Sequence, residues 1–585
     1  MLTQIVIENF KGIKSGEVSD LGKVNVLIGQ NNSGKSCILD ALCLAKYACG
    51  PQPQMFNEPL PMILLHRRGI ERSHYTVRNF WHNYDTKNTI SLKLWFKNGE
   101  KLNIEIKWRD DDSFDVYLQD LSGGISAHID GKYFAAFNAD MEGTTRVFFG
   151  FQEDVDAFNK RYPHLFHYLD ELTLVDDYVA RKLEKLERSI FGRVLEPRLD
   201  KRIVKELNDI FGMKAEAMGF IPISPTSAAY RLSIAEQEHS LHIDELGDGA
   251  KYTTTILSLC LLLENSALLI EEIESHQHPG ALQKFLPSIV KIAHEKNVQL
   301  FITTHSLEVI QTLASLPKEY DVRFFHVERS FDGILTARPL PTIDIKLLSD
   351  LGVDIRNLEM FKKFIVVEGR EDKVFIESLL RRYDKRIEDV GYLIIAGNKD
   401  LVKHVSAALV STKKDIIAML DYDTSDKDSL INDMCNTLKN RGYTVSRDGN
   451  TILINGGPKV IVLPMGLPDD ETLKDIGITS HSMEDYCLKL IELDKGLMDV
   501  TLGSLADTAK KAEKDSKRLK SKAILQVLAI KKDMEFEDVI RYIVEHVDKD
   551  KLEKVVDESF DMLLGLAWKG PQICESLPPR LDMDL

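Results

Sequence analysis

Short apolar segments alternate with amphipathic helical segments along most of the chain. The segment 23–28 (KVNVLI) is largely apolar and predicts a buried strand, whereas residues 37–48 carry their apolar side chains at helical spacing. Two later segments, TISLKLWF and KLNIEIKW, alternate apolar and polar residues, which predicts strands with one buried face. We therefore expect residues 1 to about 150 to be rich in strands.

A change of pattern between residues 155 and 218 predicts a helical insertion. Charged residues become frequent there, and the segment YVARKLEKLERSI has the clearest helical periodicity. The segment is much too short for a long coiled coil. Strand patterns resume near Tyr230 and continue to the segment ARPLP at 337–341. One domain is thus expected in two parts, 1–154 and 219–345, around an insertion at 155–218.

A second domain is expected over residues 346–585. Its apolar segments KFIVVEG, YLIIAG and DIIAMLD alternate with helical patterns, as in parallel sheets whose strands are joined by helices. The C-terminal part of this domain is expected to be helical. Both domains therefore belong to the α/β fold class.

Length and composition favour a multidomain protein without a membrane-spanning helix. With 585 residues the chain is too long for one hydrophobic core, and no apolar run reaches the ~18 residues that a membrane-spanning helix needs. The N-terminal sequence contains Glu8 and no signal peptide is expected, so we expect a cytoplasmic protein without a membrane partner. The seven cysteines form no CxxC pair, which argues against a zinc module.

The net charge of −16 argues against a generally basic surface, but a local basic groove is enough to contact nucleic-acid phosphates. The best candidate lies at 510–522, where a solvated helix face is the alternative explanation. Its basic residues are Lys510, Lys511, Lys514, Lys517, Arg518, Lys520 and Lys522.

The motif GQNNSGKS at 29–36 fits the GxxxxGK[ST] phosphate loop and lies between a predicted strand and a predicted helix, as such a loop requires. Glycines let backbone N–H groups turn inward around phosphate oxygens, Lys35 reaches the terminal phosphates, and the Ser36 hydroxyl is placed to ligate Mg²⁺. The expected nucleotide contacts come from Asn31, Asn32, Ser33, Gly34, Lys35 and Ser36.

Three further motifs supply what hydrolysis of a nucleotide needs. The apolar segment ALLIEE ends in Glu271, which is expected to hold Mg²⁺, and Glu272, the expected general base. The segment QLFITTHS ends near His305, which is placed to sense a γ-phosphate. Gly247 and Gly249 flank Asp248 at the start of an apolar helix, whose N-terminus can face an anion.

A separate set of acids follows the strands of the second domain. Glu368 ends one predicted strand and Asp372 lies one helical turn beyond it, while Asp421 and Asp423 end another strand at a spacing of two. Carboxylate oxygens suit Mg²⁺ or Mn²⁺. Two such ions can activate water and stabilise a leaving oxygen during phosphodiester cleavage.

Together, the motifs IVIENFKGIKSGEV, GQNNSGKS, LGDGAK, LLIEEIESHQHP and FITTHS resemble the ABC-type ATPase heads of the SMC, RecF and OLD (overcoming lysogenization defect) families. The resemblance implies that the turn containing Gly247 and Gly249 completes the ATP site of a partner subunit, and hence at least a homodimer. Two departures bear on the hydrolysis rate. Glu271 stands where many relatives have Asp, and LGDGAK replaces the usual LSGGQ.

The order EGxxD, strand and DxD resembles a TOPRIM domain. In nucleases of that group a later acid and a lysine complete the site. The segment HSMEDY matches the acid, with Glu484 as the ligand of a second metal ion and Asp485 as a further candidate, and Lys520 or Lys522 matches the lysine that neutralises transition-state charge.

An ABC-type head with a helical insertion, followed by a TOPRIM domain, is similar to the OLD family of ATP-dependent nucleases, which includes the nuclease subunit of the Gabija antiphage system. This resemblance implies an endonuclease that nicks or cuts duplex DNA under control of an ATPase dimer joined through the insertion. It implies ATP with one Mg²⁺ at the ATPase site, two Mg²⁺ or Mn²⁺ ions at the TOPRIM site, and a role in phage defence.

Three alternatives remain open at this point. The chain could be a DNA-repair ATPase like SMC or RecF proteins, although that leaves the second set of acids unexplained. TOPRIM chemistry could serve a primase or a topoisomerase, although no zinc module or separate strand-passage domain is evident. Finally, the chain could be an effector that acts only with a second defence-system protein or a nucleic-acid component.

Overall fold

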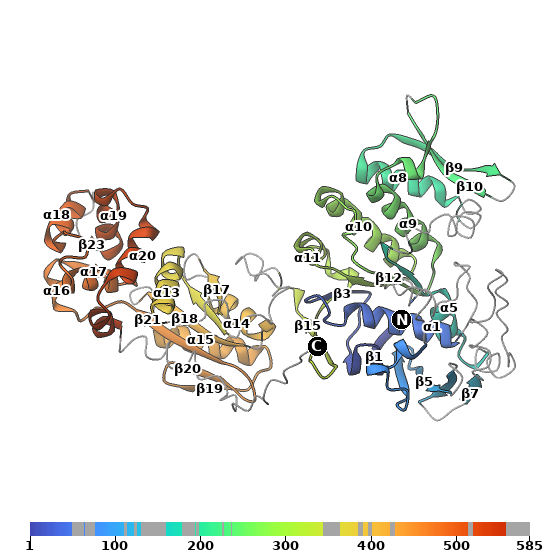
Figure 1. Cartoon of the computed structure of the whole chain (residues 1–585), viewed down its shortest axis with the longest axis horizontal. Helices are drawn as coiled ribbons and strands as arrows, with labels where there is room; N and C mark the ends of the chain where they lie inside the picture. Colours follow the sequence, from blue (N-terminus) through green and yellow to red (C-terminus); the bar gives the residue numbers. More distant parts are fainter. Residues whose placement is uncertain are drawn as a thin grey trace, which may run out of the picture. The chain divides into compact units, whose positions relative to one another are not determined.

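The computed structural model gives two compact units, Met1–Lys346 and Leu347–Leu585, whose elements are labelled in Figure 1. The residues described are 1–49, 64, 77–109, 114–121, 126–129, 160–177, 179, 194, 198–224, 227–235, 237–342, 345, 363–383, 390–395, 401–412, 414–421, 427–512 and 519–556.

Among the described residues, the first unit is built on a mixed twelve-stranded sheet. In spatial order its strands are β7 (Ser126–Ile129), β6 (Phe114–Asp120), β5 (Lys101–Trp108), β4 (Ile90–Phe96), β1 (Leu2–Phe10), β2 (Ile13–Val18), β15 (Ile334–Leu340), β14 (Val322–Arg329), β3 (Val24–Ile28), β13 (Gln299–Thr303), β12 (Ala267–Ile270) and β8 (Thr173–Val175). The predicted α/β class and the strand-rich N-terminal region are confirmed.

Strand pairing places the phosphate loop and the segments that follow β12 and β13 at one edge of the sheet. The strands β14, β3, β13, β12 and β8 pair in parallel, so their carboxyl ends lie together. The strand β1 ends at the same edge, because it runs antiparallel to β2, which is parallel to β15, the antiparallel neighbour of β14. Loops far apart in sequence therefore converge there.

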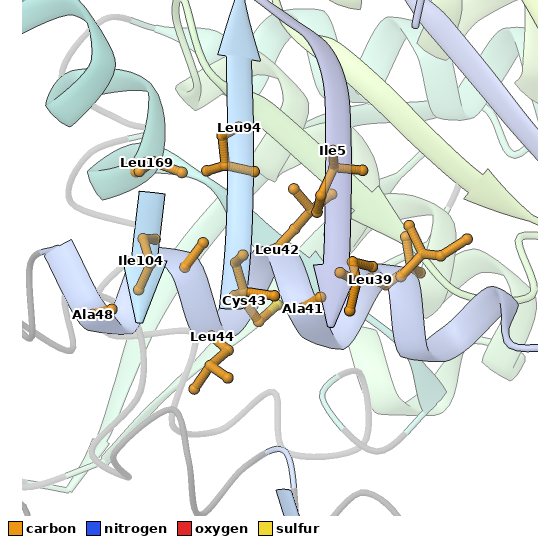
Figure 2. Close-up of a cluster of buried hydrophobic side chains, with 14 of the residues drawn as sticks. Ile5, Leu39, Ala41, Leu42, Cys43, Leu44, Ala48, Leu94, Ile104 and Leu169 are labelled. Atoms are coloured by element: carbon orange, nitrogen blue, oxygen red, sulfur yellow. The ribbon is translucent and has the colours of Figure 1, made fainter. Parts of the chain in front are cut away.

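The helix that follows the phosphate loop, α1 (Lys35–Cys49), is held by a continuous hydrophobic core. Figure 2 shows Leu42 of α1 near Ile5 of β1. Leu94 of β4, Ile104 of β5 and Leu169 of α5 (Pro163–Glu171) belong to the same cluster. These side chains are almost completely buried. The packing fixes the N-terminus of α1, and with it the end of the phosphate loop.

The region 155–218 differs from the predicted helical insertion. It contains α5, the sheet strand β8, the helix α8 (Leu199–Phe211) and the start of β9 (Ala215–Ser224). The strand β8 pairs in parallel with β12, so this part is continuous with the main sheet. Most of YVARKLEKLERSI lies outside the described residues.

A smaller sheet and four α-helices also belong to the described part of this unit. The sheet has the order β11 (Leu241–His242), β10 (Ser227–Ile234) and β9. The helices α8, α9 (Asp248–Leu262) and α10 (Pro279–Glu295) contact one another, and α11 (Leu307–Ala314) packs against α10.

Within its described residues, the second unit contains a six-stranded sheet of order β17 (Val390–Ile394), β16 (Lys363–Val367), β18 (Asp415–Asp421), β21 (Lys459–Met465), β20 (Thr451–Ile454) and β19 (Val445–Asp448). The first four strands are parallel, as expected, and the hairpin β19–β20 adds an antiparallel edge. Its described helices include α13 (Arg370–Arg382), α14 (Leu401–Thr412), α15 (Lys427–Asn440), α16 (Glu471–Asp475), α17 (Glu484–Leu493), α18 (Leu502–Ala512), α19 (Ser521–Lys532) and α20 (Phe536–His546).

One hydrophobic core joins this sheet to the C-terminal helices. Ile365 of β16 and Ile417 of β18 belong to the same buried cluster as Tyr486 of α17, Leu525 of α19 and Ile540 of α20. The strands β22 (Ile478–Ser480) and β23 (Leu519–Lys520) pair in parallel and hold the starts of α17 and α19 together. Among the described residues, no helix is long and apolar enough to cross a membrane.

Candidate functional site

A cavity of about 630 Å³ lies at the edge of the first sheet where the loops converge. This volume is within the usual range for a small-molecule site. The cavity brings together Glu271, Glu272 and His305, which follow β12 and β13, with the phosphate loop after β3. Its phosphate-loop lining includes all six expected contacts, namely Asn31, Asn32, Ser33, Gly34, Lys35 and Ser36.

The phosphate loop requires glycine at two positions. Gly29 has φ +145°, and a Cβ atom there would lie 2.3 Å from the carbonyl oxygen of Val327. Gly34 has φ +100°, and a Cβ atom there would lie 2.6 Å from the side chain of Leu335. Residues with side chains rarely adopt such backbone conformations. The loop is therefore packed closely against β14 and β15, and its fold depends on these glycines.

The end of the phosphate loop has the donors for a hard cation. The Ser36 hydroxyl donates a hydrogen bond to Oε1 of Glu271. The backbone of Glu271 is fixed by hydrogen bonds to Val175 (2.9 Å) and from the Tyr252 hydroxyl (3.2 Å). A hydroxyl and a carboxylate at one point are oxygen ligands of the kind that Mg²⁺ prefers. The residues present thus fit the expected ion.

Glu272 and His305 are held by groups that the sequence analysis did not identify. The amide of Glu272 donates to the Thr303 hydroxyl (2.9 Å), and the amide of His305 donates to a carboxylate oxygen of Glu274 (2.6 Å). Glu272 has φ +49°, a left-handed conformation that costs energy in a residue other than glycine. Thr303 lies in the motif TTHS and Glu274 lies in the motif EEIES. Both residues therefore belong to segments already recognised in the sequence, but no sequence pattern assigned them a role.

Gly247 and Gly249 lie outside this cavity. Gly247 caps α9, as the sequence analysis expected. A Cβ atom at Gly249 would lie 2.6 Å from the carbonyl oxygen of His276, and Gln277 donates a hydrogen bond to the carbonyl of Gly249 (2.8 Å). The turn is thus fixed to the segment after Glu272, and the structure does not place it on the nucleotide site of its own chain.

The cavity also contains an ion pair that the sequence did not predict. Lys11 Nζ lies 2.7 Å from a carboxylate oxygen of Asp40, whose side chain is almost completely buried. The ammonium group also lies over the rings of Phe10 (5.6 Å) and Phe80 (5.7 Å). Lys11 belongs to the motif ENFKG, but only the fold brings it to α1.

In the second unit, the acids converge at the carboxyl ends of β16 and β18. A carboxylate oxygen of Glu368 accepts a hydrogen bond from the amide of Asp421 (3.0 Å), and Asp372 accepts one from the amide of Gly369 (2.8 Å). Burial, followed by the charges of Glu368, Asp372 and Glu484, raises the pKa of Asp421 to about 8. Asp423 lies outside the described residues.

The pKa values of Asp372 and Glu484 are also raised, and burial is the largest cause for both. Burial, followed by the charge of Glu484, raises the pKa of Asp372 to about 7. Burial also raises the pKa of Glu484, which accepts a hydrogen bond from the Ser482 hydroxyl (2.7 Å). Buried carboxylates that repel one another favour a bound cation, which would relieve the repulsion.

Lys522 joins this cluster, whereas Lys520 is exposed. Its ammonium group forms an ion pair with Glu371, a residue that the sequence analysis did not single out although it lies within the EGRED segment. Burial lowers the pKa of Lys522, but the hydrogen bond to Glu371 and the charges of Glu484 and Asp372 outweigh that effect and raise it overall. Of the two candidate lysines, Lys522 is therefore the one placed beside the acids.

The chemistry of the carboxylate cluster suits a metal ion. Within the described ranges, which omit Asp423, no three acidic, histidine or cysteine side chains are arranged closely enough to hold an ion. The donors are all carboxylates, as Mg²⁺ and Mn²⁺ prefer. Glu368, Asp372, Asp421 and Glu484 are thus the described residues that would hold such ions, with Asp423 as a further expected ligand.

Asp485, the further candidate from HSMEDY, has a different environment from its neighbour Glu484. It is completely buried and accepts hydrogen bonds from the amide of Leu467 (2.8 Å), from His481 Nδ1 (2.8 Å) and from the Ser521 hydroxyl. These bonds connect α17 to the start of α19, which carries Lys522. Asp485 therefore holds the site together, and its oxygens are already used by the protein.

Comparison with known proteins identifies the first unit as an ATPase. Residues 1–134 match the family model of an AAA ATPase domain, and residues 134–311 match that of an AAA domain described as a putative AbiEii toxin of a type IV toxin–antitoxin system. ATPase domains imply ATP binding, usually with Mg²⁺, in agreement with the cavity. The predicted ATPase is thereby confirmed at this level.

Two individual relatives share less than a quarter of their aligned residues with this chain. An ATP/GTP phosphatase of Helicobacter pylori is 22% identical over 354 residues, which cover 57% of this chain and 92% of that protein. An OLD nuclease of Thermus scotoductus is 23% identical over 344 residues, which cover 52% of this chain and 59% of that protein. Among solved structures, the SMC head domain from Thermotoga maritima matches with a TM-score of 0.33 and 13% identity, over 58% of this chain and 99% of that one.

The acidic cluster should make stability depend on pH. Because the native pKa of Asp421 is about 8, above its ordinary 3.8, the native state binds more protons than the unfolded state between these values. The stability due to the protonated side chain is therefore lost progressively as the pH rises from the ordinary pKa of 3.8 to the native pKa of about 8. Asp421→Asn should raise the melting temperature of metal-free protein at pH 9, by roughly 2–4 °C per kcal/mol of repulsion relieved, and change it little at pH 5.

Thermal unfolding in EDTA at both pH values measures this effect. Asp448→Asn, which changes an exposed acid of β19, is the matched control and should show no such pH-dependent gain. Equal melting temperatures of wild type and Asp421→Asn at pH 9 would contradict the inferred repulsion.

The buried bonds of Asp485 lead to a second prediction. Ser521→Ala removes one hydrogen-bond donor from a buried carboxylate and should lower the free energy of unfolding by about 1–3 kcal/mol, since the lost bond is not replaced by water. Urea unfolding followed by circular dichroism measures the change. Ser504→Ala, at an exposed position of α18, should be close to neutral, and an equally small effect of Ser521→Ala would argue against the role assigned to Asp485.

Proposed function

We propose that this protein is an ATP-regulated, metal-dependent DNA endonuclease of the OLD type. The observation that carries the proposal is the cluster of Glu368, Asp372, Asp421 and Glu484 beside Lys522 at the ends of parallel strands. An ATPase alone has no need for these acids, because the first unit contains its own carboxylates at the nucleotide cavity. The sequence likeness to an OLD nuclease supports the same conclusion.

The first unit binds ATP and hydrolyses it. The phosphate loop and Lys35 bind the phosphates, while Ser36 and Glu271 would hold Mg²⁺, which would supply neutralisation of phosphate charge. Glu272 orients and deprotonates the attacking water, because it lines the cavity directly after the metal-binding acid. His305 follows the adjacent strand and contacts the γ-phosphate.

The second unit is a TOPRIM nuclease domain that cleaves a phosphodiester. Its acids would hold Mg²⁺ or Mn²⁺, and such ions would supply activation of water and stabilisation of the leaving oxygen. Lys522 stabilises the negative charge that develops on the phosphate, since its ammonium group lies among the acids. Glu371 positions Lys522 through their ion pair.

Two copies of the chain form the working ATPase. The turn at Gly247 and Gly249 lies outside the cavity of its own chain, which supports a role at the nucleotide of a partner copy. The region 155–218 contributes to that dimer. Duplex DNA is the proposed substrate, and the resemblance to OLD-family proteins suggests a role in phage defence, with a second defence-system protein or a nucleic acid as activator.

Plasmid cleavage by the full chain tests the nuclease. Wild type should convert supercoiled plasmid to nicked or linear DNA with Mg²⁺ or Mn²⁺, and Asp421→Ala should abolish conversion because a metal ligand is lost. Lys35→Ala, which impairs nucleotide binding at the other unit, is the matched control: it should retain the metal-dependent activity seen without ATP and lose the effect of added ATP. Undiminished cutting by pure Asp421→Ala would refute the assignment.

ATP hydrolysis is tested separately. Glu272→Gln retains the size of the side chain but cannot accept a proton, so it should lower kcat by about 100-fold or more while ATP still binds. Phosphate release and ATP binding, measured on the same preparation, separate these two effects. Hydrolysis at the wild-type rate would exclude Glu272 as the general base.

A further inference from the structure

The nucleotide cavity has two ends, and their lining residues follow strands on opposite sides of β3 in the sheet. Glu271, Glu272 and His305 follow β12 and β13 on one side. On the other side, the lining comes from the turn after β1, which carries Lys11, and from the short helix η3 (His82–Tyr84). The proposed phosphate and metal chemistry occupies only the first of these ends.

The segment that bears η3 is firmly anchored to the core. Trp81 is 1% exposed, and its ring meets Trp108 edge-on at 5.4 Å between ring centroids. Its indole N–H donates to the carbonyl of Asn88 (2.7 Å). The amide of Lys11 donates to the carbonyl of Phe80 (2.8 Å), so the segment is also fixed to the end of β1. The base of the turn therefore has little freedom to move.

The tip of the turn has an unfavourable backbone and an exposed aromatic ring. Asn83 and Tyr84 have φ values of +51° and +58°, in the left-handed region that residues other than glycine seldom occupy. Tyr84 lines the cavity and is 67% exposed. Strained residues that a rigid surrounding holds in place are concentrated at ligand sites. A large aromatic side chain presented in this way suggests a planar ligand.

We propose that Tyr84 is the stacking platform for the nucleobase of the bound nucleotide. This inference rests on the proposed binding of ATP to the phosphate loop. With the phosphates at Lys35 and Ser36, the sugar and base must extend along the cavity, and the turn bearing Tyr84 forms its lining on the side away from β12 and β13. The ring offers a flat apolar face, and stacking of a base on such a face stabilises binding without requiring a particular base.

Binding measurements with ATP and with inorganic tripolyphosphate test this proposal, because tripolyphosphate has the phosphates but no base. Tyr84→Ala should weaken ATP binding by about 5- to 150-fold, the range typical of a lost base–aromatic stack, and leave tripolyphosphate binding unchanged. Tyr84→Phe keeps the ring and should bind ATP nearly as wild type does. GTP should lose affinity in Tyr84→Ala to a similar extent, since stacking tolerates either purine.

Phe331→Ala provides the matched control. Phe331 is a fully exposed aromatic residue between β14 and β15 that is not among the residues lining the cavity, and its removal should leave both affinities unchanged. Wild-type ATP affinity in Tyr84→Ala would overturn the proposal, and so would an equal loss of ATP and tripolyphosphate binding, because the turn would then act on the phosphate loop. Failure of wild type to bind ATP would instead refute the proposed nucleotide binding itself.

Discussion

The parallel pairing of β3 with β13 and of β13 with β12 is the constraint on which the nucleotide site depends. Ser36 and Glu271 are separated by 235 positions in the sequence, yet their side chains form a hydrogen bond. This contact exists because adjacent parallel strands end at the same edge of a sheet, so the loops that follow them meet. The buried packing of α1 against β1, β4 and β5 then fixes the phosphate loop relative to those loops.

In the second unit, the same geometry gathers a set of acids. Pairing of β16 with β18 brings Glu368 next to Asp421, and the C-terminal helices add Glu484 and Lys522. Acids gathered in this way repel one another, and burial makes the repulsion stronger, as the raised pKa of Asp421 shows. This repulsion opposes folding at the edge when the acids are charged.

The environment of a side chain, and not its identity, separates the roles of neighbouring residues. Glu484 and Asp485 are adjacent acids on α17, but only Glu484 belongs to the repelling cluster. Asp485 instead accepts hydrogen bonds from Leu467, His481 and Ser521, and these bonds hold α17 against the start of α19. The same distinction separates Lys522 from Lys520, because the helix start at Ser521 directs one lysine to the acids while the other is exposed.

The sequence by itself determined the elements and the local motifs. Apolar runs followed by glycine, acids or histidine were enough to predict β3, β12, β13, β16 and β18, and the glycine spacing at 29–36 was enough to predict a phosphate loop, because these features depend on neighbouring residues. Only the tertiary structure decided which distant groups meet. Lys11 with Asp40, Glu274 with the backbone of His305, and Lys522 with Glu371 are contacts between segments that have no local signal for one another. The place of β8 in the main sheet was missed for the same reason, since three residues carry too little pattern to reveal a partner strand.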